Sequence, residues 1–301
     1  MMRSSAYNPL GGSHGALLFK AEMFAPMIPL LPHRGGFALL HLLALGSPTF
    51  PISPEAWTAW TSSYAWQTHY GQAFLVFPPL FGHQYSHVWI DFRGIQDAYM
   101  HAKGLDYFEN SRRATLANRA YAMANPHGWA EYGANVWGLT ASDIPASYRA
   151  RGAPPPESDD GTITPTAVGG SVVFTPRESL AALRYMYATY RTRLWGPYGF
   201  KDAFNPTQQW FAPAYLAIDQ GPIVLMIENY RTGRIWHVVM QHRAIQRGLA
   251  RAGFAPVIPP DKGHAIPTRA PGTPRPVMQP VHADTPPPPP PPGLPAAQQR
   301  S

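Results

Sequence analysis

Hydrophobic positions recur at a helical period along most of this chain. Residues 36–45 (GFALLHLLAL) are apolar almost throughout and end at a Gly-Ser-Pro turn, which predicts a buried helix. Residues 222–227 are equally apolar and predict a second central helix. Residues 176–194 keep one polar face, so we expect that helix to lie at the periphery. Further helices are predicted over residues 89–100, 108–123 and 235–252, the last with a kink near its middle.

Capping signals predict where several helices begin. Thr175 and Glu178 have the spacing of a capping box, in which the threonine oxygen accepts from a backbone N–H and the glutamate reaches back to the cap. Asp219 precedes an apolar helix over residues 220–230 and is most simply its N-cap, with a role in a pocket as the alternative. Ser53, just before a proline, is expected to cap another helix.

Strand signals are weak. The exception lies between residues 137 and 171, where we expect a long loop or a short β-hairpin around Asp160-Gly161. Buried and half-buried helices that alternate and are joined by long loops suggest an all-α fold of the α/α toroid type. No sequence repeat is visible, so the pattern by itself supports only a mostly helical chain.

The last stretch of the chain, residues 255–301, has a different composition. It is rich in proline and contains an unbroken proline run at residues 286–292. Proline removes backbone donors and restricts φ, so we expect this stretch to be a disordered or polyproline II tail. The alternative is a ligand for a proline-binding domain.

Composition narrows the classes of function. The net charge is +7, but only 14% of residues are charged and the basic ones form no tract, which argues against nucleic-acid binding. The chain has no cysteine, which excludes disulfides and thiolate metal sites. His83 and His87 (HQYSH) have helical spacing but lack the glutamate of a zinc-protease motif, so we expect no metal site.

The sequence contains no membrane or export signal that we recognise. No apolar run approaches the roughly 20 residues of a membrane span. The first residues lack a basic-then-apolar signal with a small-residue cleavage site. As written, the chain is expected in the cytoplasm; it is expected in the periplasm or outside the cell if its true N-terminus lies upstream.

The candidate chemistry lies in turn-rich loops between residues 78 and 236, which carry acids, amides and aromatic side chains. This mixture suits a sugar, because flat rings stack on apolar CH faces while carboxylates and amides bond hydroxyl groups. The candidate substrate-binding residues are Trp89, Asp91, Arg93, Trp137, Asp143, Asp160, Phe200, Asp202, Asn205, Asp219 and Gln220.

Structural roles remain open for several of these residues. Asp160, before a glycine, is most simply a turn residue, and Arg93 is expected to pair with a nearby acid. The aromatic candidates, Trp89, Trp137 and Phe200, have core packing as their alternative. Asp143 is the acid most favoured for substrate contact.

Eight motifs together resemble the bacterial glycoamylase-like family, which includes endo-β-1,2-glucanases and relatives of the glycosidase-like domain of cyclic β-1,2-glucan synthases. The motifs are ALGSPT (44–49), PLFGHQYSHVWIDFRGIQD (79–97), DYFENSRRATLANRAY (106–121), NPHGW (125–129), WGLTASD (137–143), DDGTITPTA (159–167), YGFKDAFN (198–205), and IDQGP through IENYRTGRIW (218–236). The resemblance spans roughly residues 36–254, with residues 1–35 outside it. It implies an (α/α)6 barrel that hydrolyses a bacterial glucan by acid–base chemistry without a required cofactor.

The chain departs from the family at its start. Family members carry a further block of barrel upstream, with proposed catalytic acids there and at a glutamate that aligns with Gly36. We therefore expect an incomplete barrel that keeps much of the glucan-binding cleft and little of the acid–base machinery, so no catalytic residue is assigned. Two alternatives stay open, namely a non-catalytic carbohydrate-binding module and a decayed fragment.

Overall fold

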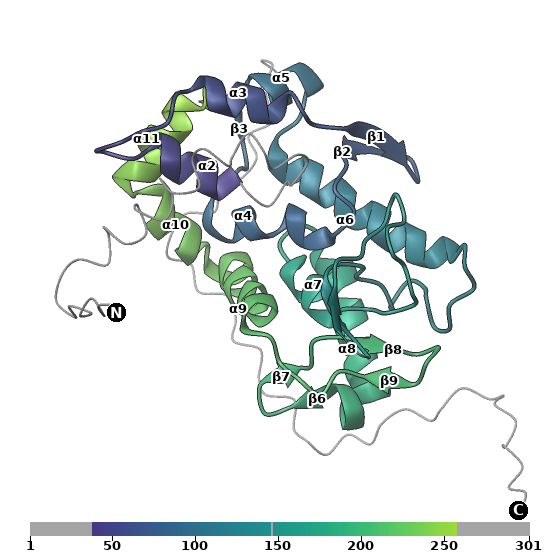
Figure 1. Cartoon of the computed structure of the whole chain (residues 1–301). Coiled ribbons are helices and arrows are strands. Elements are labelled where there is room, and N and C mark those ends of the chain that lie inside the picture. Colours follow the sequence, from purple (N-terminus) through teal and green to yellow (C-terminus); the bar gives the residue numbers. More distant parts are fainter. Residues whose placement is uncertain (1–37, 146, 258–301) are drawn as a thin grey trace, which may run out of the picture. The chain divides into compact units, whose positions relative to one another are not determined.

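The computed structural model describes residues 38–145 and 147–257 (Figure 1). The chain divides into two units, Met1–Ile258 and Pro259–Ser301, and every described residue belongs to the first. The predicted non-family segment over residues 1–35, and nearly all of the predicted proline-rich tail, lie outside the described residues.

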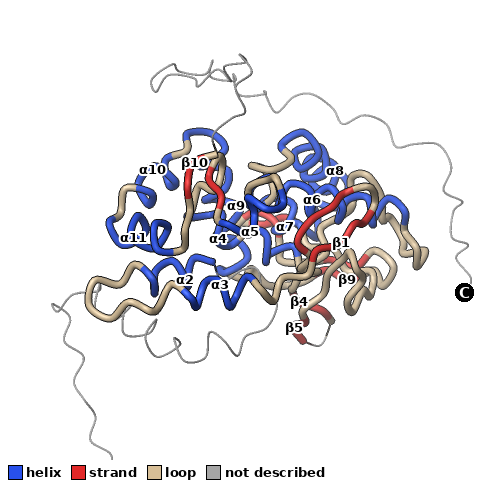
Figure 2. Tube along the Cα trace, turned by 90° about the horizontal axis from the view of Figure 1, so that it is seen from above, coloured by secondary structure: helices blue, strands red, loops and turns tan. Residues whose placement is uncertain are grey.

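Helices make up most of the secondary structure of the described residues, which confirms the mainly helical prediction (Figure 2). They are α2 (Ala38–Leu45), α3 (Glu55–Thr61), the 3₁₀ helix η3 (Leu80–His83), α4 (Tyr85–Trp89), α5 (Ala98–Lys103), α6 (Tyr107–Ala124), α7 (Pro165–Gly170), α8 (Pro176–Leu194), α9 (Ala217–Thr232), α10 (Arg234–Met240) and α11 (Arg243–Arg251). The predicted helices over residues 36–45, 108–123, 176–194 and 220–230 correspond to α2, α6, α8 and α9. The predicted kink in residues 235–252 corresponds to the break between α10 and α11.

Five small antiparallel sheets of two strands each connect these helices. The pairs are β1 (Trp66–His69) with β2 (Gln72–Leu75), β3 (Ile95–Gln96) with β10 (Ala255–Pro256), β4 (Ser142–Ile144) with β5 (Ser147–Arg149), β6 (Trp195–Gly196) with β7 (Gly199–Phe200), and β8 (Phe204–Asn205) with β9 (Trp210–Phe211). The stretch between residues 137 and 171 does contain a hairpin, but it is β4–β5 and does not lie at Asp160-Gly161. Gly161 instead takes a left-handed turn with φ of 86° that leads into α7.

The helix predicted over residues 89–100 is wrong. The chain leaves the helical conformation after Trp89, and Gly94 takes a φ of 68° that a continuous helix does not allow. A new helix, α5, begins after Asp97, whose Oδ1 accepts from the Met100 N–H at 2.8 Å.

Two capping predictions lie at or next to a helix start, but neither side chain makes the predicted capping bond. Thr175 is the N-cap of α8, but its hydroxyl pairs with the Ser179 hydroxyl at 3.1 Å and makes no capping bond to the backbone. Ser53 lies one residue before the N-cap of α3, where Pro54 stands without a side-chain cap. In both cases the sequence located the start of the helix to within one residue, and the Thr175 hydroxyl bonds another side chain in place of the backbone.

Asp219 does not cap a helix. Helix α9 starts two residues earlier, at Ala217, with Leu216 at the N-cap position. Asp219 therefore lies in the first turn, and its carboxyl group is free to reach across to another helix.

The core consists of two main clusters. One is built on α2, α3 and α11, with Leu42 and Leu45 of α2 fully buried, as predicted for residues 36–45. The other is built on η3, α6, α7 and α8 around Trp137 and Phe204. In Figure 1, α2, α3 and α11 gather on one side of α4, and α8 with the β6–β7 and β8–β9 hairpins lies on the other.

Close approach of backbones requires glycine in α11. A Cβ added at Gly248 would lie 2.0 Å from the carbonyl oxygen of Leu42. This contact lets α2 and α11 pack directly against each other, without a side chain between them.

Helix α9 is buried on one side only. Pro222 and Met226 face the core, where α9 packs on α7 and α4. Val224 is 66% exposed and Ile218 is 67% exposed, so the prediction of an all-round buried helix over residues 222–227 is wrong for the described structure. Among the described helices, none combines the length and apolar character that crossing a membrane requires.

Candidate active site

Two aspartates, Asp202 and Asp219, meet in the interior. Both are fully buried, although Asp202 follows β7 and Asp219 lies on α9. Asp202 Oδ2 accepts from the backbone N–H of Asp143 at 2.8 Å, and Asp219 Oδ1 accepts from the hydroxyl of Tyr85 at 3.1 Å. The other two oxygens, Asp202 Oδ1 and Asp219 Oδ2, have no hydrogen-bond donor among the described side chains and backbone. A proton held between the two carboxyl groups satisfies both oxygens.

Burial decides where that proton lies. It raises the pKa of Asp219 to about 8, and the hydrogen bond to Asp202 and the charge of Asp202 add to the rise. Burial also raises the pKa of Asp202, but the Asp143 N–H and the positive charge of Arg151 oppose that rise. Since two carboxyl groups in contact do not readily ionise together, Asp219 holds the proton at neutral pH and Asp202 carries the charge.

The β4–β5 hairpin brings a third acid to the pair. Asp143 lies on β4, and its backbone N–H bonds Asp202, so its side chain begins beside the carboxyl pair. Its carboxyl group is half-buried, and burial raises its pKa. Three of the predicted substrate-binding acids, Asp143, Asp202 and Asp219, are therefore brought together.

A buried arginine fixes the base of this hairpin. Arg151 is 1% exposed; its Nη1 donates to Asp160 Oδ1 at 2.9 Å and its Nη2 donates to the hydroxyl of Ser142. Ser142 directly precedes Asp143, so the ion pair ties the loop of Asp160 to the strand that contacts Asp202. Asp160 also accepts from the Thr162 N–H at 3.1 Å, as a turn residue does.

The residue before Asp160 anchors the same loop to α6. Asp159 accepts from the hydroxyls of Tyr121 and Tyr132, each at 2.7 Å, and from Trp129 Nε1 at 3.1 Å. The Gly161 N–H adds a further bond at 3.1 Å. With so many donors, the Asp159 carboxylate acts as a structural node that holds Asp160 in place.

Three other predicted site residues support the loops around the pair. Asn205 is buried, and its amide donates to the Asp160 carbonyl at 2.8 Å. Gln220, next to Asp219 on α9, donates through Nε2 to the carbonyl of Phe200. Phe200 itself is 8% exposed and packs at the edge of the core.

The predicted residues that follow α4 lie apart from the carboxyl pair. Helix α9 holds this end of α4 through Asn229, whose amide donates to a carbonyl there at 2.9 Å. Asn229 is ten residues from Asp219 along α9, a separation of about 15 Å. Asp91 and Arg93 form an exposed ion pair at 2.7 Å, and Trp89 is 38% exposed.

Trp137 is a core residue. It is fully buried and packs within the same cluster as Tyr121 and Phe204. Its indole face is covered by protein, so core packing, the alternative considered for the aromatic candidates, describes its position in this structure.

Sequence reasoning missed three residues of the site, Tyr85, Tyr148 and Arg151. Tyr85 stacks on Phe81 with ring centroids 5.0 Å apart and bonds Asp219. Tyr148 lies on β5 opposite Asp143, and Arg151 follows that strand. Tyr85 stands inside the HQYSH motif, so the motif itself was the signal that could have identified it.

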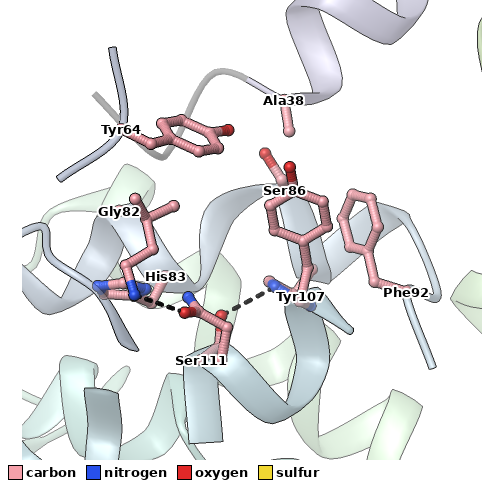
Figure 3. Close-up of a pocket in the computed structure, with 11 residues that line it drawn as sticks. Ala38, Tyr64, Gly82, His83, Ser86, Phe92, Tyr107 and Ser111 are labelled. Atoms are coloured by element: carbon pink, nitrogen blue, oxygen red, sulfur yellow. Dashed lines mark hydrogen bonds between the residues drawn. The ribbon is translucent and has the colours of Figure 1, made fainter. Parts of the chain in front are cut away.

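The two histidines of that motif line a separate small cavity of about 20 Å³ (Figure 3). His87 Nε2 pairs with the Ser111 hydroxyl at 3.0 Å, while His87 Nδ1 and His83 Nε2 have no partner among the described residues. Burial lowers the pKa of His83 to about 4 and that of His87 to about 3, so both rings are neutral at pH 7. In the described part of the chain, no three His, Cys, Asp or Glu residues are grouped so as to hold a metal ion.

Known proteins with the same architecture carry names of glucan hydrolases. The chain is 35% identical over 238 residues to an exo-β-1,2-glucooligosaccharide sophorohydrolase (non-reducing end) from Parabacteroides distasonis, covering 71% of this chain and 32% of that protein. An endo-β-1,2-glucanase from Chitinophaga pinensis, solved with sophorotriose and glucose, is 37% identical with a TM-score of 0.67, covering 72% of this chain and 53% of that one. A structure described as a "putative glucoamylase" from Bacteroides uniformis is 45% identical with a TM-score of 0.67 and the same two coverages.

The chain thus spans about a third of the length of the curated relative and about half of these solved structures. The family model named Glycoamylase, with the description "Putative glucoamylase", matches residues 37–243. That match includes Asp143, Asp202 and Asp219 with the helices and hairpins that position them, and it confirms the resemblance carried by the sequence motifs. This chain belongs to the glycoamylase family.

Proposed function

We propose that this chain forms a large part of the substrate site of a glycoside hydrolase that acts on β-1,2-linked glucan. The carrying observation is the buried Asp202–Asp219 carboxyl pair, with Asp143 beside it. It occurs in a chain similar to a β-1,2-glucooligosaccharide sophorohydrolase and an endo-β-1,2-glucanase.

The pair supplies one protonated carboxyl group, and glycoside hydrolysis needs such a group on one side of the bond. Cleavage needs a protonated carboxyl group and an ionised one that flank the scissile bond, about 5 Å apart for retention or about 6.5–9.5 Å for inversion. Asp219 and Asp202 share a proton and so lie closer together than either geometry. We therefore assign the pair to one side of the scissile bond, and a carboxyl group elsewhere to the opposite side.

The fold proposal follows from the same relatives. We take the described helices to be part of an (α/α)6 barrel, with residues 36–254 as a portion of the catalytic domain. Support comes from the packing of α7 on α9 and of α4 on both α9 and α2, and from the similarity to the glucanase structure. The one-sided burial of α9 agrees with this arrangement.

Sugar recognition would centre on Asp143, beside the carboxyl pair. The half-buried Asp143 supplies a hydroxyl acceptor and the buried Asp202 positions it, while Asn205 and Gln220 hold the surrounding loops. Trp89, Asp91 and Arg93 lie at the end of α4 that Asn229 contacts, about 15 Å along α9 from Asp219, so we place them at a more distant part of a glucan chain. A site of this kind needs no cofactor.

Calorimetric titration of the purified chain with short β-1,2-linked glucooligosaccharides tests the proposal. We expect saturable binding, weakened about tenfold by Asp143→Asn, because the half-buried Asp143 carboxylate accepts through two oxygens and the amide through only one. Glu228→Gln is the matched control, since Glu228 accepts from the Thr232 hydroxyl at the protein surface, and it should leave the affinity unchanged.

Chromatography of the same mixtures separates the functional alternatives. Release of shorter glucans that Asp219→Asn abolishes identifies a hydrolase, while binding without products identifies the carbohydrate-binding alternative. Equal affinity for β-1,4-linked glucooligosaccharides, or no binding to either series, would contradict the proposed substrate.

A further inference from the structure

The β4–β5 hairpin carries an aromatic residue to the same place as its acid. In the antiparallel register, Asp143 on β4 lies directly opposite Tyr148 on β5. Side chains of directly opposed residues project from the same face of a hairpin. The backbone N–H of Asp143 bonds Asp202, and the Tyr148 hydroxyl lies close enough to Asp219, Asp202 and Asp143 to interact with their charges, so the hairpin places Tyr148 near the carboxyl pair.

Tyr148 differs from the other tyrosines around these acids. Tyr85 donates its hydroxyl to Asp219, and Tyr121 and Tyr132 donate theirs to Asp159. The Tyr148 hydroxyl has no hydrogen-bond partner within residues 38–145 and 147–257, and its side chain is 48% exposed. The Tyr148 hydroxyl is thus a hydrogen-bond donor near the acids from which none of them accepts.

The electrostatic surroundings keep that donor protonated. Burial and the negative charges of Asp219, Asp202 and Asp143 all raise the pKa of Tyr148, with Arg151 as a weaker opposing charge. The hydroxyl therefore remains an O–H donor throughout the physiological pH range.

A sugar hydroxyl is complementary to this arrangement. Carboxylates only accept hydrogen bonds, whereas a sugar hydroxyl donates one and accepts others. The Arg151 guanidinium is not accessible to a sugar, because Arg151 is 1% exposed and lies beneath the hairpin with Asp160 and Ser142 as its partners. The exposed phenol is the group in position to donate to the sugar.

We propose that Tyr148 is a sugar-contacting residue of the carboxyl site. Its hydroxyl donates to a glucan hydroxyl that itself donates to the half-buried carboxylate of Asp143, and its exposed ring covers that sugar unit. The inference rests on the proposed function, since it takes a β-1,2-linked glucan as the ligand.

The test is calorimetric titration of the full chain with β-1,2-linked glucotriose and glucotetraose. Tyr148→Phe removes the hydroxyl alone and is expected to weaken binding about five- to tenfold, the loss of one hydrogen bond. Tyr148→Ala also removes the ring and is expected to weaken binding further, about thirtyfold or more. Tyr187→Phe and Tyr187→Ala are matched controls, because Tyr187 is 41% exposed on α8 and contacts Trp195 rather than the acids.

The outcomes separate this inference from the proposed function. If the unaltered chain binds the glucan and Tyr148→Phe binds equally well, the inference is overturned and the proposed function stands. Equal losses in the Tyr148 and Tyr187 variants would also overturn it, since they would indicate a general effect of removing a tyrosine. If the unaltered chain binds no β-1,2-linked glucan, the proposed function fails first. Thermal melts that match the unaltered chain confirm that each variant is folded.

Discussion

The hydroxyl of Tyr85 on α4 donates to Oδ1 of Asp219 on α9 at 3.1 Å, across 134 residues of sequence. This bond joins two helices that also meet near the other end of α9, where the Asn229 amide bonds the Val88 carbonyl of α4. Helix α9 is therefore fastened to α4 at two points, which limits how far Asp219 can move relative to α4.

Removing the Tyr85 hydroxyl should raise the pKa of Asp219 further. The hydrogen bond from Tyr85 stabilises the ionised form of Asp219 and so opposes the rise that burial causes. We expect Tyr85→Phe to move the titration midpoint of Asp219 upward by up to about one pH unit, the worth of a hydrogen bond. Carboxyl infrared or NMR titration measures it. Tyr121→Phe, which removes a donor to Asp159 instead, should leave that midpoint in place.

Stability should fall as pH rises through the titration of Asp219. Its folded pKa of about 8 lies above that of an unfolded aspartate, so the folded state binds the extra proton between about pH 4 and pH 8. Each pH unit in that window removes up to about 1.4 kcal/mol of unfolding free energy. Asp219→Asn imitates the protonated acid, since its amide can donate to Asp202 and accept from Tyr85. Urea unfolding from pH 5 to pH 9 should show a flatter profile for Asp219→Asn, and parallel profiles would contradict the shared proton.

The buried histidines act in the opposite direction. The pKa values of His83 and His87 lie near 4 and 3 when folded, below that of an unfolded histidine, so the unfolded state binds more protons in acid. Their stabilisation is complete above about pH 6.5 and declines as pH falls, by up to about 1.4 kcal/mol per pH unit for each ring. Thermal melts between pH 7.5 and 4.5 should show this loss, reduced in His87→Gln. His101→Asn, on the exposed side of α5, is the control and should follow the unaltered chain.

Arg151→Met should destabilise the β4–β5 hairpin. The substitution leaves Asp160 without its cation and the Ser142 hydroxyl without its donor, in a site where Arg151 is almost fully buried. We expect a loss of about 3 kcal/mol in urea unfolding. Asp160→Asn should cost less, because the Asp160 side chain is 26% exposed and an amide oxygen can still accept from Arg151. Equal losses for the two variants would show that burial of Arg151 is not the dominant factor.

Two glycines in helices should respond to alanine in opposite ways. Gly248→Ala places a Cβ 2.0 Å from the Leu42 carbonyl and should push α2 from α11, at a cost of about 2–3 kcal/mol. At Gly221 of α9 an added Cβ meets nothing within 4 Å, so Gly221→Ala should stabilise by about 0.5–1 kcal/mol through helix propensity. Urea unfolding of the two variants compares them directly. A destabilised Gly221→Ala would mean that this face of α9 is covered by residues beyond those described.

Sequence patterns correctly located those helices whose apolar spacing and bounding turns lie close together in the sequence. Residues 36–45 and 108–123 gave helices because their apolar spacing and their bounding turns agree over more than two turns. The helix predicted over residues 89–100 failed because one glycine and one aspartate cap redirect the backbone there. In a stretch this short, such signals outweigh periodicity.

In the candidate site, too, some features follow from the sequence and others only from the tertiary structure. The sequence alone predicted Asp143, Asp202 and Asp219 among the candidate acids of a sugar site, and its motifs identified the family. It did not indicate that Asp202 and Asp219 share a proton, nor that Tyr85, Tyr148 and Arg151 surround them. Residue type and spacing determine which groups are available to bond. Burial and long-range contact determine their charge, and these arise only when helices and hairpins far apart in the chain pack together.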